Sequence, residues 1–317
     1  MSASPLLVAR QARISVDDSV AIPSFDLETK GRRLVLAGGV GPLFAALSNI
    51  PLGAADAARA AARDEIVDIA GRARASAGEL LLVGRDVSRQ EHLAFVGAAP
   101  LDPPAAAEWS LLEYVVTSTR LALAARGSRA SGAETTKRSQ AALDLVGLGA
   151  GGKRPIQSLT APERRVLVLA AAAAADPEVI VAERPLAGLE DQAAAFVMKA
   201  MEAVFETRFA VITVDRLAAG TPEGAFTRRA SDVALFFGGE LGVFGSPADV
   251  LRSARLYRVV VASNADLLRA ALSERGLVLE GGPTQFSLAT TEEASVSDVL
   301  RVASEVRSAV VEIVPLM

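Results

Sequence analysis

The sequence predicts an α/β fold built on a parallel sheet, followed by a smaller α+β unit of ferredoxin-like topology. Short apolar strands alternate with helical segments, most clearly at 179–182, 193–205 and 209–214, and such alternation is typical of parallel sheets. After Leu251 the expected order becomes strand, helix, strand, strand, helix, strand, which is the ferredoxin-like pattern. The 317 residues are 51% hydrophobic, enough for a large core. We therefore expect domains at 1–250 and 251–317.

The elements of the first domain follow from apolar runs and turn residues. Pro42 stands where the first turn of a helix tolerates proline, so a helix is expected over 43–50. Residues 54–75, rich in Ala and Arg, predict an exposed helix, and 100–157 predict a helical region interrupted at Gly127 and Gly132. The remaining expected elements are strands at 6–16, 24–27, 34–36, 79–83 and 93–96, turns at 31–33 and 84–86, a helix at 162–175, and a hairpin of 233–237 with 241–244 around 238–240.

In the C-terminal part, strands are expected at 257–262, 277–279, 285–290 and 310–314, with helices at 265–275 and 297–306.

Composition excludes several functional classes. The chain has no cysteine, so disulfides, thiolate metal sites and cysteine nucleophiles are ruled out. Its net charge of −4 argues against a nucleic-acid partner. His92, the one histidine, cannot form a multi-histidine metal site and is interpreted as structural or surface-exposed. The apolar run 166–175 is too short to span a bilayer, and no signal peptide is visible, so we expect a cytoplasmic protein that reaches a membrane only through a partner.

Several segments, in order, resemble the motifs of ATP-binding cassette (ABC) ATPases. The segment 178–190, EVIVAERPLAGLE, resembles their Walker B strand and D-loop. Further similarities are 79–86 to the strand GEVLLDGRD, 96–100 to the Q-loop VPQxP, 158–165 to the signature LSGGERRR, 175–178 to ADPE, and 238–247 to xGxLVAxGSPxE. The resemblance covers nearly the whole chain. It implies an ABC-type P-loop NTPase fold with a helical subdomain at about 100–157, and an accessory domain at 251–317.

The phosphate loop departs from the family pattern. A working loop reads Gly-x-x-x-x-Gly-Lys-Ser/Thr, in which backbone N–H groups, the lysine and the hydroxyl hold phosphate and Mg²⁺. The corresponding turn is Gly38-Gly39-Val40-Gly41-Pro42, which is shorter and has no lysine or hydroxyl. Proline also removes one N–H donor. Either the turn keeps a residual anion site at a helix N-terminus, or it is a glycine turn for close packing, the interpretation that the lost donors favour.

At two further positions the family's functional residue is replaced. The Q-loop glutamine, which in the family helps to bind Mg²⁺ and links the site to the membrane partner, corresponds to Ala98, in an expected loop. The switch histidine corresponds to Asp215. No aromatic residue precedes Phe25, so the family's adenine-stacking residue is missing too.

The signature segment keeps a helix start but loses glycines. In the family it contacts the γ-phosphate of ATP held by the opposite subunit. Thr160 retains a hydroxyl, whereas Ala161 and Pro162 replace the glycines. Thr160 and Glu163 have the spacing of a capping box. The favoured interpretation is helix capping, and the alternative is a residual contact in trans with ATP on an intact partner.

At the Walker B position Glu183 replaces the metal-side aspartate and Arg184 replaces the catalytic glutamate, while Glu190 replaces the D-loop aspartate. Arginine is permanently charged and cannot accept a proton from water. We expect Arg184 to form a salt bridge with Glu183 or Glu190. The alternatives are a phosphate contact or a solvent-facing side chain.

These departures predict a pseudo-ATPase with no cofactor beyond weak ATP in trans. The leading hypothesis is a structural or regulatory nucleotide-binding-domain subunit of an ABC-transporter-like complex, dimerised with itself or with an intact ABC ATPase and bound to a membrane permease subunit. The alternatives are a cytoplasmic scaffold or regulator not tied to transport, and a residual ATP-binding subunit. Candidate residues for the permease surface, or else for the core, are Trp109, Leu111, Leu112, Tyr114 and Val115.

Overall fold

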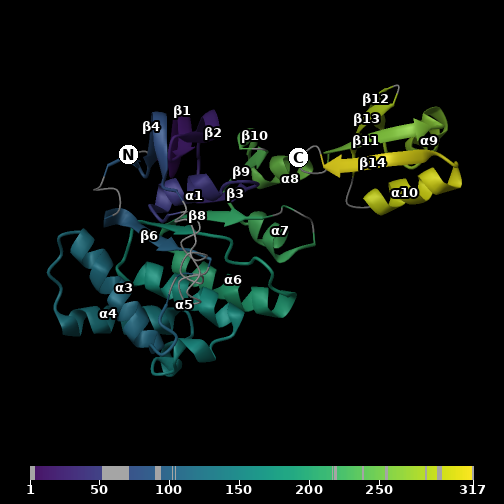
Figure 1. Cartoon of the computed structure of the whole chain (residues 1–317). Helices are drawn as coiled ribbons and strands as arrows, with labels where there is room; N and C mark the ends of the chain where they lie inside the picture. The colour runs from purple at the N-terminus through teal and green to yellow at the C-terminus, as the bar shows by residue number, and fades with distance from the viewer. Residues whose placement is uncertain are drawn as a thin grey trace. The chain divides into compact units, whose positions relative to one another are not determined.

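The computed structural model (Figure 1) describes residues 4–51, 71–89, 94–101, 103, 105–215, 217, 220–237, 239–253, 256–282, 284–290 and 295–315. The chain divides into two compact units. The first comprises residues 1–216 and 220–247, and the second comprises 217–219 and 248–317. Residues 54–70 of the helix expected over 54–75 lie outside the described residues, as do His92 and Gly238.

The first unit is centred on a mixed six-stranded sheet in the order β10-β9-β3-β8-β7-β6. Neighbouring strands from β9 to β6 run parallel, and β10 pairs antiparallel with β9. The bounds are β3 Arg33–Ala37, β6 Val96–Ala99, β7 Val179–Ala182, β8 Phe209–Val214, β9 Asp232–Phe237 and β10 Glu240–Gly245. All four residues of β7 are buried, because helices cover one face of the central sheet and the antiparallel sheet with α1 covers the other. The predicted α/β class is confirmed.

A second, antiparallel sheet has the order β2-β1-β4-β5. It comprises β1 Leu7–Val16, β2 Ser19–Glu28, β4 Ala73–Leu82 and β5 Arg85–Asp86. The register of β1 against β4 shifts where Gln11 and Gly78 both adopt positive φ. A Cβ on Gly78 would lie 2.1 Å from the carbonyl oxygen of Gln11, so this irregular pairing requires glycine.

The helices of the first unit gather mainly below the central sheet in Figure 1. There α3, α4 and α5 pack against one another, and α5 also packs against α6. The bounds are α1 Gly41–Ser48, α3 Leu111–Ala125, α4 Gly132–Leu145, α5 Ala161–Ala174, α6 Asp191–Phe205 and α7 Pro222–Thr227. Helix α8 Pro247–Ser253 belongs, from Ala248 on, to the second unit. Helix α3 begins with a capping box formed by Ser110 and Glu113, and α5 begins with the predicted one.

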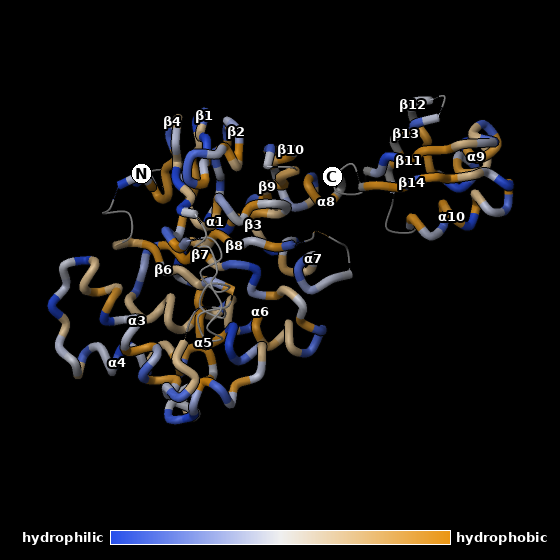
Figure 2. The backbone as a smooth tube through the Cα atoms, viewed as in Figure 1, coloured by the Kyte–Doolittle hydropathy of each residue, from blue (hydrophilic) through white to orange (hydrophobic). Residues whose placement is uncertain are grey.

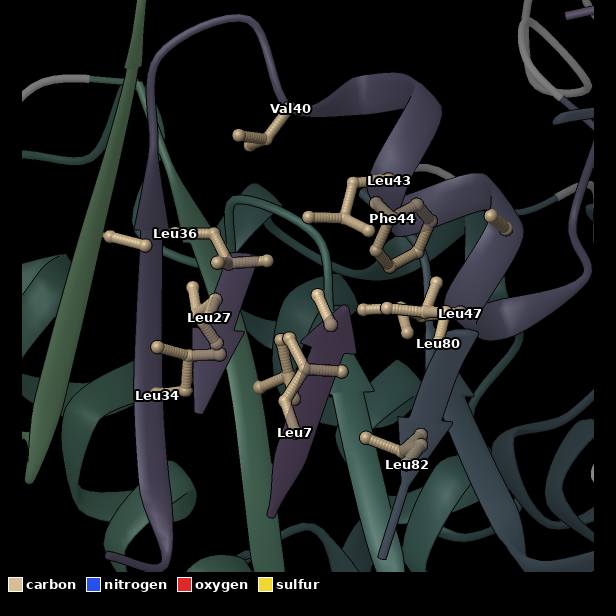
Figure 3. Close-up of a cluster of buried hydrophobic side chains, with 14 of the residues drawn as sticks. Leu7, Leu27, Leu34, Leu36, Val40, Leu43, Phe44, Leu47, Leu80 and Leu82 are labelled. Carbon is tan, nitrogen blue, oxygen red and sulfur yellow. The ribbon is translucent and has the colours of Figure 1, made fainter. Parts of the chain in front are cut away.

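The core between the two sheets is closed by α1. Figure 3 shows leucines of β1, β2, β3 and β4 pointing towards the same space as Leu43, Phe44 and Leu47 of α1. Six consecutive residues of α1, from Leu43 to Ser48, are buried. Figure 2 shows the hydropathy along the chain, with apolar stretches around β6 and β7 and a mixture of polar and apolar stretches along the helices.

The second unit has the strand order β12-β13-β11-β14. Its elements are β11 Leu256–Ser263, α9 Ala265–Ser273, β12 Leu279–Gly281, β13 Gln285–Ala289, α10 Val296–Glu305 and β14 Ala309–Pro315. Leu268 and Leu272 of α9 and Val299 of α10 are buried against Val259 of β11 within one apolar cluster. The βαββαβ order is confirmed.

Several local predictions were wrong or incomplete, among them the strand expected at 277–279, since β12 begins only at Leu279. Residues 73–75, expected at the end of a helix, belong to β4, where they pair with β1. The expected turn at 84–86 is shorter, because Val83 and Gly84 adopt positive φ and Arg85 already pairs with Leu82. The strand expected over 93–96 begins at Val96. Helices α7 and α8 were not expected from the sequence.

Candidate functional site

The carboxyl ends of β3, β8, β7 and β6 lie side by side, because these strands are neighbours and parallel. This edge is where open α/β sheets place their ligand sites. The connections that leave it begin at Gly38 after β3, Asp215 after β8, Glu183 after β7 and Pro100 after β6. The fold therefore brings together the predicted phosphate loop, switch and Walker B positions.

The turn after β3 is tight, since only residues 38–40 separate the strand from α1. Gly38 has φ +86°, and a Cβ there would lie 1.9 Å from the carbonyl oxygen of Phe236 in β9. The N–H of Val40 donates to the carbonyl of Gly38 at 2.6 Å. The Val40 side chain is 3% exposed and belongs to the apolar core, pointing the same way as Leu43 in Figure 3. Close packing of the turn against β9 thus accounts for Gly38.

Two positions of this turn offer no backbone donor to a ligand. Pro42 has no N–H, and the N–H of Val40 already has an intramolecular acceptor. Gly39 is exposed, with open space around its Cβ position. Helix α1 has no acidic or basic residue in its first or last turn.

Arg184 lies between two carboxylates after β7. Its Nη2 is 3.7 Å from Glu183 Oε1, and its Nη1 is 3.3 Å from Asp215 Oδ1. The salt bridge expected with Glu183 is confirmed. No ion pair joins Arg184 to Glu190 among the described residues, where Glu190 is instead an exposed residue preceding α6.

The backbone at Arg184 is unusual for a residue other than glycine. Its φ is +42°, in the left-handed region. Its N–H donates to both the hydroxyl and the carbonyl oxygen of Thr213 in β8, at 3.0 and 3.1 Å. Glu183 is fixed as well, because its Oε2 accepts the N–H of Leu101 at 3.0 Å. The guanidinium is thus held across the ends of β7 and β8 by both backbone and charge.

The motif comparison had predicted a loop at Ala98, and this prediction was wrong. Ala98 lies inside β6, where it pairs with Val181 of β7. The neighbouring Gly97 is needed for packing, because a Cβ there would lie 2.3 Å from the carbonyl oxygen of Ala172 in α5. Ala98 lines a pocket of about 130 Å³ between β6, α3 and α5, together with Tyr114.

Burial raises the pKa of Tyr114 to about 12, although a hydrogen bond with Ser118 acts in the opposite direction. Both side chains line the Ala98 pocket. The pocket lining therefore combines the uncharged phenol of Tyr114 with the guanidinium of Arg126, and it includes no carboxylate.

The start of α5 has the predicted capping box. The backbone N–H and the hydroxyl of Thr160 both donate to Glu163 Oε2, at 2.8 and 2.9 Å. Arg154 Nη1 contacts Glu163 Oε1 at 2.8 Å. This ion pair, with the Thr160 bonds, lowers the pKa of Glu163 to about 2. Ala161 and Pro162 form the first residues of α5, so the segment is held by local contacts.

The candidate surface residues of the helical region divide into two groups. Leu111 and Val115 are fully buried, so for them the core alternative holds and the surface alternative was wrong. Trp109 is exposed, while Leu112 and Tyr114 are half-buried. Leu121, which the sequence had not singled out, is 68% exposed on α3.

Sequence reasoning predicted Glu183 but missed two other partners of Arg184. Both Asp215 and Thr213 lie at the end of β8, about thirty positions further along the chain. The available signal was the alternation that predicts β7 and β8 as parallel neighbours, since opposite charges directly after two such strands come together.

Comparison with solved structures identifies the fold. One match is cbiO1 from Clostridium perfringens, described as part of the ABC transporter complex cbiONQ, with TM-score 0.58 and 18% identity over 78% of this chain and 90% of that one. A nucleotide-free ATP-binding cassette from an ABC transporter matches with TM-score 0.58, 12% identity and coverage of 78% and 94%. The ADP conformation of MJ1267, an ATP-binding cassette of an ABC transporter, matches with TM-score 0.59, 13% identity and coverage of 79% and 94%.

The sequence itself matches no protein-family model, and no curated protein matches it. At these identities the structural similarity establishes the fold and not the chemistry. The chain therefore has the fold of an ATP-binding cassette, as its motif order had predicted. In the described part of the chain, no helix is both long and apolar enough to cross a membrane.

Proposed function

We propose that this protein is a non-catalytic ATP-binding-cassette homologue that acts as a structural or regulatory subunit of an ABC-transporter-like membrane complex. The observation that carries the proposal is the position of Arg184. Its guanidinium is paired with Glu183 and Asp215 at the edge where cassette ATPases carry out hydrolysis. A paired cation here offers no base for water and no carboxylate free to hold Mg²⁺.

The phosphate turn supports the same proposal. Triphosphate binding in P-loop proteins depends on several converging N–H donors, a lysine and a hydroxyl. At Gly38–Pro42 one donor is missing at proline, another is bonded within the turn, and Val40 is packed into the core. These residues do not fit a Mg²⁺-nucleoside triphosphate, so we assign no nucleotide cofactor to this chain.

The signature segment also supports a weakened contact with ATP that an opposite subunit holds. The hydroxyl and the N–H of Thr160 already donate hydrogen bonds to Glu163, and Pro162 has no N–H to donate. Losing one positioned donor to a transition-state phosphate costs on the order of 10²-fold in rate. A site that pairs this segment with an intact cassette partner could thus retain some binding but would hydrolyse ATP slowly.

A membrane permease is the partner that the retained helical region favours. Trp109 and Leu121 expose apolar surface on or beside α3, and the Ala98 pocket opens between α3 and β6. Exposed apolar groups next to a pocket are typical of protein-binding surfaces. The neighbour cbiO1 is described as part of a transporter complex. We place the protein at the inner face of the membrane, held there by such a partner.

The enzymatic part of the proposal is tested by ATPase turnover and calorimetric titration with Mg²⁺-ATP, using the full chain. We expect turnover at background and no saturable binding in the range where cassette ATPases work. The matched variant is Arg184→Ala, which removes the cation and leaves the rest of the edge unchanged. Magnesium-dependent turnover that Arg184→Ala abolishes would overturn the proposal.

The transport part is tested by isolation from native membranes with a tagged full-length chain. Recovery in a detergent-stable complex with a polytopic membrane protein is the expected result, and Leu121→Asp should reduce the yield of that complex. Recovery only as a soluble homodimer, with or without the substitution, would favour a cytoplasmic scaffold instead.

A further inference from the structure

The Ala98 pocket, of about 130 Å³, lies between two facing helix surfaces and the edge strand of the central sheet. One wall is a row of residues along α3 and its C-cap, spaced four apart and therefore on one face of the helix. A row on α5 forms the opposite wall, and β6 forms the floor. The α3 row consists of Tyr114, Ser118, Ala122 and Arg126, and the α5 row consists of Val168, Ala171, Ala172 and Ala175.

The pocket is open because small side chains stand where the two rows face each other. Ala122 on α3 and Ala171 on α5 are half-buried and line the space. Protein interiors are otherwise close-packed, so a leucine at either position would fill much of it. An engineered cavity of about 150 Å³ admits benzene, so this pocket has room for a molecule of about six non-hydrogen atoms.

Arg126 brings a cation to this pocket without a carboxylate to pair with it. Among the described residues Arg126 forms no ion pair, and the carboxylate of Asp176 pairs with Arg208 instead, at 2.8 Å. The side chain of Arg126 is half-buried. Burial is the largest influence on the pKa of Arg126 and lowers it, while the charges of Asp176 and Arg138 act in opposite directions.

The carbonyl oxygens at the end of α5 compensate only part of this charge. Nη1 of Arg126 donates to the carbonyl oxygens of Ala175 and Asp176, and the end of a helix carries about half an elementary negative charge. Nε is buried and closed to a ligand, but Nη2 has no acceptor in the part of the chain that the structure describes. A carboxylate would add charge-assisted hydrogen bonds to such a guanidinium.

Tyr114 supplies a second donor to the pocket. Burial raises the pKa of Tyr114 to about 12, so the phenol keeps its proton at neutral pH. The hydrogen bond with Ser118 favours the ionised phenol, which makes the serine hydroxyl the donor and leaves the phenol O–H free to donate to a ligand. The remaining lining is aliphatic, from valines and alanines, and includes no carboxylate that would repel an anion.

We propose that the Ala98 pocket binds a short-chain aliphatic monocarboxylate of about the size of butyrate. The carboxylate accepts hydrogen bonds from the Arg126 guanidinium and the Tyr114 phenol, and the hydrocarbon tail packs on Val168 and the alanines. One cation selects one carboxylate, and the aliphatic walls disfavour a strongly hydrated inorganic anion. The site is complete within this chain, so the inference goes beyond the proposed function and needs neither a partner protein nor ATP.

The test compares matched probes on the full chain. Butyrate and butyramide have the same number of non-hydrogen atoms, but only butyrate is charged, and acetate keeps the charge without the tail. Binding is followed by NMR of protein with labelled alanine and valine methyl groups, because Val168 and Ala171 line the pocket. We expect saturable shifts of these signals, with butyrate binding about tenfold more tightly than butyramide and about fivefold more tightly than acetate.

Three variants locate the binding. Tyr114→Phe removes the phenol donor and keeps the shape of the pocket, so butyrate should bind about threefold to tenfold more weakly. Ala122→Leu fills the pocket and should abolish the saturable shifts. Arg126→Gln should weaken butyrate by about tenfold or more and leave butyramide almost unchanged, whereas a loss of folding would affect both probes alike.

The matched controls lie on the exposed part of the same helix. Arg120→Gln removes a guanidinium and Ala124→Leu adds a larger side chain, and neither position lines the pocket. Both variants should bind butyrate as the native protein does. Thermal melts confirm that every variant is folded.

Three results would overturn the proposal. Equal affinity for butyrate and butyramide would mean that the Arg126 charge selects nothing. Saturable shifts that persist in Ala122→Leu would place the ligand outside the pocket. The absence of any saturable shift in the native protein would mean that water alone fills it. ATPase turnover and recovery with a membrane protein do not enter these measurements, so the inference and the proposed function fail separately.

Discussion

Replacing Glu163 with Gln isolates the charge of the ion pair at the start of α5. Glutamine at this position can still accept the N–H of Thr160, so the capping geometry is retained while the attraction to Arg154 is lost. The folded-state pKa of Glu163 is about 2, against an ordinary value of 4.5. Without any screening by solvent, that difference in pKa corresponds to about 3 kcal/mol of folding stability at neutral pH.

Solvent reduces this figure. Glu163 is 21% exposed, but Arg154 is 43% exposed, and water around the guanidinium screens the attraction. We therefore expect Glu163→Gln to lower the free energy of unfolding by about 1–2 kcal/mol at pH 7. A folded-state pKa below the unfolded value means that the contribution is complete above about pH 4.5. It is lost as the pH falls from there towards about 2.

The assay is urea unfolding at pH 7, 5, 4 and 3, followed by the fluorescence of Trp109. This is the one tryptophan of the chain, and its carbonyl accepts the N–H of Ile156 beside α3, so it reports on the helical region. The gap between the native protein and Glu163→Gln should shrink steadily below pH 5. A gap that stays constant from pH 7 to pH 3 would refute the reasoning.

The matched control is Glu134→Gln in α4. Glu134 also contacts an arginine at 2.8 Å, and that hydrogen bond lowers its pKa, but both side chains are more exposed than Glu163. We expect a clearly smaller change at pH 7. Equal deficits for the two variants would show that burial contributes nothing at Glu163.

Two further predictions concern the nucleotide edge. Gly38→Ala should destabilise the protein by about 2–4 kcal/mol in denaturant unfolding, because φ is +86° and the new Cβ would meet the carbonyl oxygen of Phe236. The control is Gly39→Ala, which has open space around its Cβ position and should cost less than about 1 kcal/mol. Equal costs would contradict the close packing of this turn. Arg184→Gly should have a free energy of unfolding about 1 kcal/mol higher than Arg184→Ala, because both variants lose the ion pairs and only glycine adopts a positive φ without strain. A higher stability of Arg184→Ala would mean that the backbone at this position is not strained.

Local patterns were sufficient for most of the fold. The capping box of Thr160 and Glu163 depends on residues three apart, so spacing alone predicted it. The alternation that gave β7, α6 and β8 likewise depends on periods visible within one segment. The second unit was predictable for the same reason, with apolar residues repeating at strand and helix periods.

The errors arose where tertiary contacts override local preference. Residues 73–75 are alanine and arginine, which favour helices, yet they pair with β1. The loop expected around Ala98 is a strand because β7 supplies its hydrogen-bonding partners and Gly97 admits α5. Motif comparison gave the position of Ala98 in the chain but not its conformation.

The candidate site was predictable in position but not in contacts. Motif order placed Arg184 at the end of β7, and nearby charge correctly indicated Glu183 as a partner. The contact with Asp215 required the register of β7 against β8, in which Ala182 lies opposite Ile212. The positive φ of Arg184 follows from two hydrogen bonds to Thr213, a restraint that no short sequence window contains.

Arg184→Glu is the substitution that most directly separates a missing residue from a missing site. It restores the carboxylate of cassette ATPases but puts three carboxylates together, since Glu183 and Asp215 would lose their shared cation. Like charges at this separation repel, so we expect a stability loss of about 1 kcal/mol that salt partly reverses. Turnover should stay at background, because Val40 remains in the core and Pro42 still offers no donor. The measurement is ATPase turnover beside urea unfolding of the same preparation. Recovered hydrolysis in this single variant would mean that the turn after β3 still holds triphosphate, and that Arg184 alone had silenced the site.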